Sequence, residues 1–376
     1  MASKPIVRML TAGLTLLMLI VAVPLSTNGQ IVTDQPTSGR AGITYTYWKI
    51  STDAGDATLS QTWLPMSVFL PIQENLEAQV FFSTTSSSID TDIADARVTG
   101  LGDLRLQVSR SVMEDQVLLS LGMSLPTGKT ELDLGAESEL LQLLAESFLD
   151  VPSRRWGEGF GLNLLVGGAQ HWQGWNLAAS AAWWYSGAYT PYEGSGDYNP
   201  GDLLRLVARA QKPGDALSWS GGLSYTHYAA DQVDGDKTFR QSPYLQTYVG
   251  ADYRRNSMYM SNLIRYTLRG DNKLFVDDAS SQTLKLYGNE LQLLSRVVFD
   301  VAPDWYAGPT LSVRLIGGND MGFDNSHTVR IGALVGKSLT EKHRLHAEAR
   351  YMRGSADGGN ISLSGLQLML EFKAEL

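Results

Sequence analysis

The sequence contains no cysteine, only five histidines and 18% charged residues over its 376 positions. The absence of cysteine excludes a disulfide framework, a thiolate nucleophile and thiolate metal sites. Beyond the N-terminal stretch, no segment holds enough consecutive apolar residues to cross a membrane as a helix. Any part of the mature chain that spans a membrane must therefore be built from strands.

The N-terminal stretch, residues 1–29, is typical of a secretory signal peptide. Lys4 and Arg8 give it a positive start, and Met9–Val23 is an apolar run that is short for a membrane span. An uncleaved anchor is the alternative interpretation. Cleavage would remove two positive charges and no acid, so the formal net charge of −9 would become −11. An acidic mature chain argues against nucleic-acid binding.

From Ala41 onward, segments of about ten residues alternate apolar and polar side chains, which indicates strands with one apolar and one polar face. One such segment places apolar residues at every second position: Trp175, Leu177, Ala179, Ala181, Trp183 and Tyr185. Because the chain has many such strands and no separate core sequence, the pattern predicts a sheet closed on itself, apolar outside and polar inside.

The predicted fold is all-β, a transmembrane antiparallel up-and-down β-barrel of about 16 strands, with 14 as the alternative. The expected strands are 41–50, 59–71, 75–86, 98–110, 116–126, 159–170, 174–187, 202–212, 217–230, 243–254, 257–269, 286–301, 304–316, 327–338, 343–353 and 361–376. The expected organisation is a signal peptide at 1–29, a short periplasmic segment at 30–40 and the barrel at 41–376.

Short connections alternate with longer ones rich in Gly, Asp, Ser and Asn along the whole predicted barrel. This alternation is typical of outer-membrane barrels, which have short periplasmic turns and long external loops. We therefore expect the bacterial outer membrane as the location. Outer-membrane lipid, lipopolysaccharide and the barrel-assembly machinery are the expected partners, and the oligomeric state is left open.

Aromatic residues fall near both ends of the predicted strands, as expected for rings at the two lipid headgroup levels. Trp172, Trp175, Tyr253, Phe299 and Trp305 lie near the periplasmic turns, and Trp183, Tyr185, Tyr225, Tyr266 and Tyr351 lie near the external ends. Two bands at opposite strand ends favour a barrel over a soluble sandwich.

Two motifs on adjacent strands carry a family resemblance. Gly100-Leu-Gly-Asp-Leu104 opens the fourth predicted strand, and Leu125-Pro-Thr-Gly128 ends the fifth. Their order and spacing resemble the outer-membrane transporter family associated with phenol meta-cleavage pathways, which is similar to the long-chain fatty-acid and toluene transporters. The resemblance implies passive uptake of small hydrophobic or aromatic compounds. Gln30–Gly42 is too short for the N-terminal plug of fatty-acid transporters, so a gating element must come from a loop.

The longest predicted loop, Thr127–Gly159, is the third external one. Leu141, Leu144 and Phe148 recur within it at helical spacing, which predicts a short amphipathic helix with Ser138 as a possible N-cap. Such a helix either dips into the mouth as a constriction, or packs over the rim against lipopolysaccharide or a neighbouring subunit.

Seven arginines fall on the polar faces of the predicted strands and are expected to line the lumen as the substrate pathway. They are Arg205, Arg209, Arg265, Arg269, Arg296, Arg314 and Arg330. A row of fixed cations would favour anionic solutes. The alternative is an internal ion-pair network that braces the wall, because the guanidinium fork suits carboxylates equally well.

The sequence offers weak candidates for catalysis or metal binding. Ser326 and His327 are adjacent on a strand and so face opposite ways, as do His343 and His346. The acidic segment Asp231–Asp236 lacks the full spacing of a calcium loop. We therefore expect no catalytic residues, no metal, no cofactor and no enzymatic activity.

The leading prediction is an outer-membrane channel for passive uptake of small hydrophobic or aromatic compounds. A general or anion-preferring porin is the first alternative, favoured if the inward arginines line an open pore. A hydrolase at the external rim and a structural or adhesion barrel are the remaining alternatives.

Overall fold

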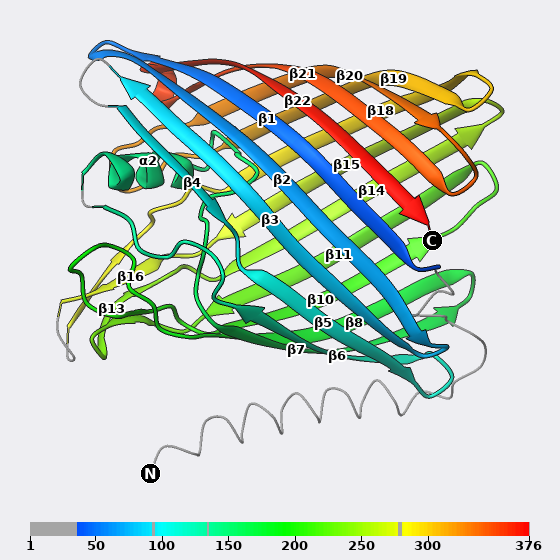
Figure 1. Cartoon of the computed structure of the whole chain (residues 1–376), viewed down its shortest axis with the longest axis horizontal. Coiled ribbons are helices and arrows are strands. Elements are labelled where there is room, and N and C mark those ends of the chain that lie inside the picture. The colour runs from blue at the N-terminus through cyan, green and yellow to red at the C-terminus, as the bar shows by residue number, and fades with distance from the viewer. Residues whose placement is uncertain (1–35, 92–94, 134, 277–279, 376) are drawn as a thin grey trace.

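The computed structural model describes residues 36–91, 95–133, 135–276 and 280–375. They form a closed antiparallel barrel (Figure 1). The wall consists of β1 (Ser38–Thr52), β2 (Gly55–Gln73), β3 (Leu76–Thr91), β4 (Asp95–Leu101), β5 (Leu104–Val112), β6 (Val117–Leu125), β7 (Gly161–Trp172), β8 (Trp175–Ser186), β10 (Leu203–Lys212), β11 (Leu217–Tyr228), β14 (Tyr244–Arg255), β15 (Met258–Arg269), β18 (Glu290–Ala302), β19 (Trp305–Ile316), β20 (Ser326–Ser338), β21 (His343–Ala356) and β22 (Ile361–Glu375).

The wall sheet contains 17 strand segments, of which β4 and β5 are two halves of one wall strand, because both pair with β3. The barrel therefore has 16 strands, and the predicted fold class is confirmed. Pairing of β1 with β22 closes it. The predicted strand positions agree with the structure to within a few residues along most of the chain.

Outside the barrel wall, the loops form a second, five-stranded sheet that periodicity did not predict. Its strands are β9 (Tyr198–Asn199), β12 (Asp231–Val233), β13 (Asp236–Arg240), β16 (Asn272–Phe275) and β17 (Ser281–Leu284). It lies at the same end of the barrel as helix α2 (Ala136–Ala145), and the C-terminus of the barrel lies at the other end (Figure 1). We call these the loop end and the turn end. A 3-10 turn, Asp357–Gly359, joins β21 and β22 at the loop end.

The alternation of short and long connections is less strict than the sequence suggested. At the loop end, only Asp53 and Ala54 separate β1 from β2, and β21 is joined to β22 by four residues, 357–360. The strands that meet at these two connections are long, up to 19 residues in β2. They include polar residues that the sequence pattern assigned to loops. No helix among the described residues is long and apolar enough to cross a membrane.

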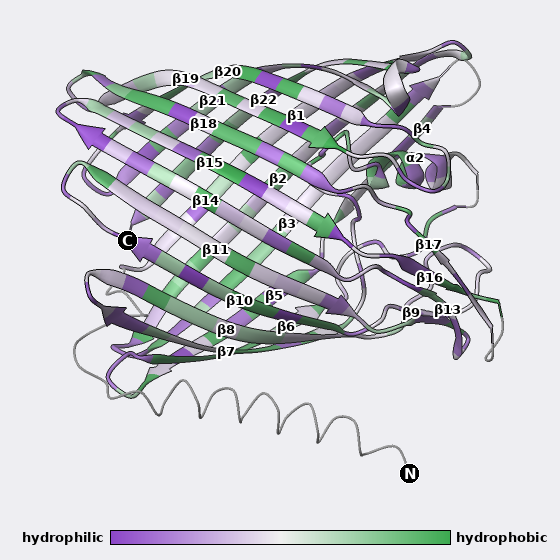
Figure 2. Cartoon of the chain, turned by 180° about the vertical axis from the view of Figure 1, so that it is seen from behind, coloured by the Kyte–Doolittle hydropathy of each residue, from purple (hydrophilic) through white to green (hydrophobic). Residues whose placement is uncertain are grey.

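The outer face of the wall is apolar. Along β22, Leu366, Leu368, Leu370 and Phe372 are all exposed, whereas the intervening Gln367 is buried. Figure 2 shows the same mixture of hydrophobic and hydrophilic positions along strand after strand. Exposed apolar side chains in this number are stable only against lipid, so the alternation places the membrane around the wall and water inside it.

Aromatic rings lie flat on the inner wall where a neighbouring strand carries glycine. Tyr248 on β14 pairs across the sheet with Gly222, and Tyr306 on β19 pairs with Gly336. A Cβ atom at either glycine would overlap the ring of its partner. These glycines therefore serve the packing of the inner wall, and the lumen side is not uniformly polar.

The wall strand formed by β4 and β5 is interrupted at Gly102 and Asp103, and the interruption changes the pairing. β5 pairs with β3 on one side and β6 on the other, but β4 pairs with β3 alone. β6 ends at Leu125, level with the start of β5. Beyond that point the edge of β4 has no strand partner among the described residues, so another part of the chain must cover it.

Candidate functional site

The loop at 127–159 folds back into the barrel, and we call it the inward loop. Its helix α2 lies within the loop end of the wall (Figure 1). The inward loop contributes Leu132, Leu140, Leu144, Phe148, Leu149, Val151 and Trp156 to a buried apolar cluster. The wall contributes Trp48, Ile50, Leu59, Ile89, Ala96, Val98, Met352, Ala356 and Leu363. An apolar patch on the inner wall thus meets the apolar face of the loop, which removes both from water.

The predicted constriction residues lie at this contact. Leu144 is fully buried, Phe148 stacks on Phe323 with ring centroids 5.7 Å apart, and Leu141 is half-buried against the same cluster. Of the two placements left open by the sequence, the structure has the loop inside the mouth. The N-cap expectation was wrong: the cap is Gly135, and Ser138 lies in the first turn of the helix, where its hydroxyl donates to the Gly135 carbonyl (2.7 Å).

Side chains of the wall bind the backbone of the inward loop directly. The indole nitrogen of Trp48 donates to the carbonyl of Leu149 (3.0 Å). Gln61 makes a two-way contact, since its Nε2 donates to the carbonyl of Ser153 (2.7 Å) and its Oε1 accepts from the Ser153 N–H (2.9 Å). These hydrogen bonds satisfy backbone groups that would otherwise be buried without a partner. They also hold the inward loop at one position against β1 and β2.

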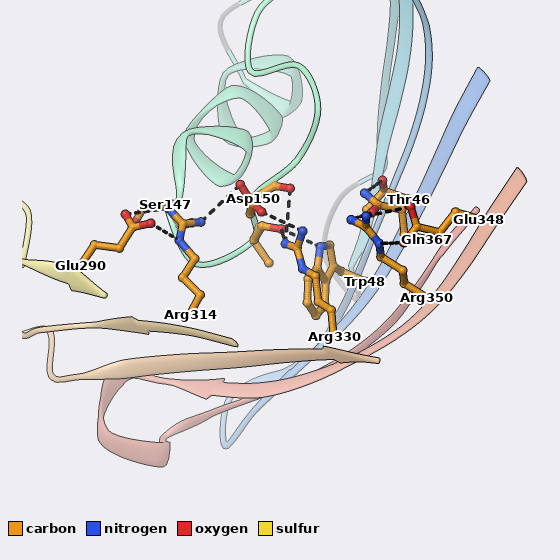
Figure 3. Close-up of polar contacts among 11 residues, drawn as sticks. Thr46, Trp48, Ser147, Asp150, Glu290, Arg314, Arg330, Glu348, Arg350 and Gln367 are labelled. Carbon is orange, nitrogen blue, oxygen red and sulfur yellow. Dashed lines mark hydrogen bonds and ion pairs between the residues drawn. The ribbon is translucent and has the colours of Figure 1, made fainter. Parts of the chain in front are cut away.

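The strongest electrostatic anchor is Asp150, which lies between two buried arginines of the wall (Figure 3). Its carboxylate is 2.7 Å from Nη1 of Arg330 and 3.4 Å from Nη1 of Arg314. Arg314 also donates from Nε to Glu290 (2.7 Å) and from Nη1 to the carbonyl of Ser147. The loop therefore closes an ion-pair network that begins on β18 and ends on β20.

The two motifs that carry the family resemblance meet at the base of the inward loop. The carboxylate of Asp103 accepts the backbone N–H of Gly128 (2.9 Å) and of Glu158 (2.6 Å), so it ties both ends of the loop together. The hydroxyl of Thr127 donates to the carbonyl of Gly102 (3.1 Å). This clamp lies at the break between β4 and β5, where the wall lacks ordinary pairing.

Trp156 fills the space beside this clamp. Its indole nitrogen donates to the carbonyl of Thr85 (2.9 Å), and the residue is nearly fully buried. A Cβ atom at Gly100 would lie 3.2 Å from the indole ring, and one at Gly102 would lie 3.4 Å from the Trp156 carbonyl. Because Gly100 and Gly102 have no side chain, Trp156 of the inward loop can pack against β4 at this point.

The seven arginines of the predicted pathway all lie on the face opposite the exposed apolar side chains, and they divide into two groups. Arg269, Arg314 and Arg330 form ion pairs with Glu290 or Asp150. No carboxylate of the described residues lies within 4 Å of the other four, which are Arg205, Arg209, Arg265 and Arg296. Arginines in direct ion pairs and arginines without one therefore coexist, on different parts of the wall.

The register of the strands places two of the unpaired arginines in one row across the inner wall. Arg209 pairs with Gly222, Gly222 with Tyr248, and Tyr248 with Arg265. Tyr248 thus places an aromatic ring between the two cations of this row. A further arginine of the inner wall lies close to a ring. The guanidinium of Arg269 lies 5.6 Å from the ring centre of Tyr244, a cation–π distance.

A second polar network on the inner wall was not identified from the sequence. Glu348 accepts from Nε of Arg350 and from the hydroxyl of Thr310, both at 2.7 Å. Arg350 also donates to Gln367, which donates in turn to Thr46 (Figure 3). The alternation of apolar and polar residues places Arg350 on the inner face, so the sequence could have identified it as a further inward arginine. The same holds for Arg105 on β5.

Among the described residues, at least two cavities open on the inner wall. One, of about 530 Å³, lies between β3 and β8 below the end of the inward loop and includes Arg105, Trp184 and Asn163 in its lining. The other, of about 300 Å³, lies along β15, β18 and β19 and includes Arg296 and Arg350. Each therefore combines a cation with uncharged polar and apolar side chains.

The weak metal and nucleophile candidates remain apart. In the described part of the chain, no group of three or more His, Cys, Asp or Glu residues could hold a metal ion. Asp231 instead accepts from the hydroxyl of Tyr198 (2.6 Å) and the N–H of Gly201 (2.8 Å). Burial raises the pKa of Tyr198, and the adjacent carboxylate raises it further, so the phenol stays a neutral donor.

The histidines show the expected separation of faces. Ser326 is buried on the inner wall, whereas His327 is exposed on the outer wall and contacts Ser355 at 3.3 Å. His343 stacks on Phe372 on the outer face, and His346 stacks on Tyr306 on the inner one. These two histidines are therefore not placed to share a ligand.

Comparison with known proteins assigns the chain to no family. No family model matches the chain, and no curated protein matches its sequence. A Pseudomonas aeruginosa FadL homologue is 9% identical, with 90% of each chain covered and a TM-score of 0.43. An outer membrane channel from Pseudomonas putida F1 is 10% identical, with 93% of this chain and 99% of that chain covered and a TM-score of 0.38. These likenesses do not show the association with phenol meta-cleavage pathways.

The expectation that the chain is not an enzyme requires correction. OmpT of Vibrio cholerae, as expressed in the outer membrane, is 10% identical, with 92% of this chain and 99% of that chain covered and a TM-score of 0.42. A barrel fold by itself excludes no enzymatic function and establishes none. The fold itself shows that this protein is a closed 16-strand antiparallel β-barrel with an apolar outer face, as a membrane-spanning barrel requires.

Proposed function

We propose that the protein is a passive outer-membrane channel that admits small organic anions, aromatic ones among them. The observation that carries the proposal is the group of inward arginines without a carboxylate within 4 Å among the described residues, Arg205, Arg209, Arg265 and Arg296. Fixed charges of one sign along a water-filled lumen raise the local concentration of the opposite ion. Tyr248, which lies between Arg209 and Arg265 in the same row of the inner wall, offers an aromatic ring to flat solutes that carry a negative charge.

The inward loop supports a selective route over a wide general pore. It occupies the lumen beside β1 to β4 and β20 to β22, where it is held by Asp150 and by the clamp at Asp103. Solute must therefore pass along the remaining wall, which carries Arg205, Arg209 and Arg265. A loop that narrows the lumen on one side brings the solute closer to the cations on the other.

The test is the reversal potential of single channels in a planar bilayer under a salt gradient. The wild type is expected to prefer anions, and the double variant R209Q/R265Q is expected to lose most of that preference. The matched control is R97Q/R110Q, because Arg97 and Arg110 are exposed on the outer faces of β4 and β5. Equal reversal potentials in the wild type and R209Q/R265Q would contradict the proposal.

Uptake of neutral hydrophobic compounds, the first expectation from the sequence, is the second candidate. The unpaired edge of β4 favours it, because backbone pairing does not close the wall there and the base of the inward loop covers the gap. A lateral route into the lipid would require that base to move. Uptake of a neutral aromatic compound into liposomes that is abolished when the inward loop is cross-linked to β3 would support this candidate.

A further inference from the structure

We infer that the 530 Å³ cavity below the end of the inward loop is a binding site for a small aromatic carboxylate. The inference rests on the proposed function, because the ligand reaches the cavity through the lumen. The cavity is lined by five consecutive wall strands, β3, β5, β6, β7 and β8, and by residues 158–160 at the end of the inward loop. Its volume falls within the range of about 300–1,000 Å³ that is typical of small-molecule sites.

Arg105 supplies the positive charge of this site. It lies on the inner face of β5 and is the only lysine or arginine in the lining. No carboxylate of the described residues lies within 4 Å of it, so its guanidinium fork is available to an incoming anion. Glu158 also lines the cavity, but its charge interacts with Arg155 of the same loop. A bidentate contact with a carboxylate is the geometry for which arginine is suited.

Aromatic side chains form the walls on both sides of the cation. Phe81 comes from β3 and Trp184 from β8, the first and last of the five lining strands, and both face inward. Phe160 lines the cavity beside the end of the inward loop. Because Phe81 is paired across the sheet with Arg105, its ring can contact the face of a flat ligand whose carboxylate binds Arg105, which selects an aromatic over an aliphatic acid.

Uncharged polar groups complete the lining. Gln79, Gln107 and Asn163 offer amide donors and acceptors to the ligand or to water. Asn163 reaches across β6 because residue 122 is glycine, and a Cβ atom there would overlap the Asn163 amide. The lining thus has one cation, aromatic side chains and a few uncharged polar groups, beside Glu158, whose charge interacts with Arg155; this composition suits a small organic anion bound at Arg105.

The test is isothermal titration of the purified full-length protein with sodium benzoate and, separately, with benzyl alcohol. Benzoate is expected to bind the wild type at least tenfold more tightly than benzyl alcohol does. R105Q is expected to weaken benzoate binding at least tenfold, and F81L severalfold. The matched control is R110Q, which removes an arginine from the outer face of the same strand and is expected to stay within twofold of the wild type. Heat-dependent electrophoretic mobility verifies that each variant retains the folded barrel.

Equal benzoate affinity in R105Q and the wild type would overturn the assignment, as would equal affinity for benzoate and benzyl alcohol. The outcomes separate this site from the proposed function. If only the site assignment fails, R209Q/R265Q still shifts the reversal potential while R105Q leaves benzoate binding unchanged. If only the proposed function fails, benzoate binding remains dependent on Arg105 in a channel with no anion preference.

Discussion

The anchor at Asp150 gives the sharpest test of how the inward loop is held. The substitution D150N preserves the shape of the side chain and removes its charge. Both partner arginines have side chains less than a tenth exposed, at 8% for Arg314 and 7% for Arg330, whereas the Asp150 side chain is 38% exposed. Removing one partner of a fully buried pair costs about 3–5 kcal/mol. Because water reaches this carboxylate, a cost of about 1–2 kcal/mol is expected here.

A cost of that size multiplies the population of the undocked loop by a factor of about 5–30. The apolar cluster with Leu144 and Trp156 is unchanged in D150N, so the loop is expected to remain docked most of the time. Two changes are expected in planar-bilayer recordings. The channel should open and close more often, and its anion preference should rise because Arg330 loses its ion-pair partner, whereas Arg314 keeps Glu290.

The control is D236N, which makes the same charge change at the exposed first residue of β13, where no ion pair of Asp236 is present among the described residues. D236N is expected to match the wild type in switching rate and reversal potential. If D150N also matches the wild type in both quantities, the ion pairs do not hold the loop, and the docking must depend on the apolar cluster alone.

Two further substitutions test the seat of the loop and the packing of the inner wall. W156A should lower the docking free energy by about 3 kcal/mol or more, because it empties a buried site. Trypsin should then cleave after Arg154 in liposome-embedded protein while the barrel keeps its heat-dependent mobility, and resistance equal to the wild type would contradict the assignment. G222A should destabilise the barrel in urea by about 1–3 kcal/mol, because a Cβ atom there overlaps the Tyr248 ring. G221A, where the nearest atom to a Cβ is 3.5 Å away, is the matched control and should change stability little, and equal midpoints for both variants would refute the packing argument.

The sequence determined the barrel, because lipid on one face and water on the other impose a period of two on every wall strand wherever its partners lie. The strand from Trp175 to Ser186 was predicted at 174–187 for this reason. The interruption at Gly102 and Asp103 was missed, because each half keeps the apolar alternation and only the pairing with β6 reveals the break.

The inward loop shows where periodicity stops being informative. Helical spacing of Leu141, Leu144 and Phe148 predicted an amphipathic helix, but a rim and a lumen can both bury its apolar face. The choice depends on a patch of the inner wall to which Trp48 and Leu363 contribute, and strands remote in the sequence bring these residues together.

For the arginines, the sequence determines which face of the wall they lie on, and the tertiary structure determines whether they are ion-paired. Alternation alone puts Arg209 and Arg314 on the inner face, since adjacent residues of a strand point to opposite sides. Whether such an arginine stays uncompensated depends on which carboxylates arrive beside it. Asp150 reaches Arg314 from a loop more than 160 residues away in the chain, because burial of that loop's apolar face carries the carboxylate into the lumen. The sequence thus determined a barrel with cations facing water, and only the tertiary structure decided which of them are free to meet a solute.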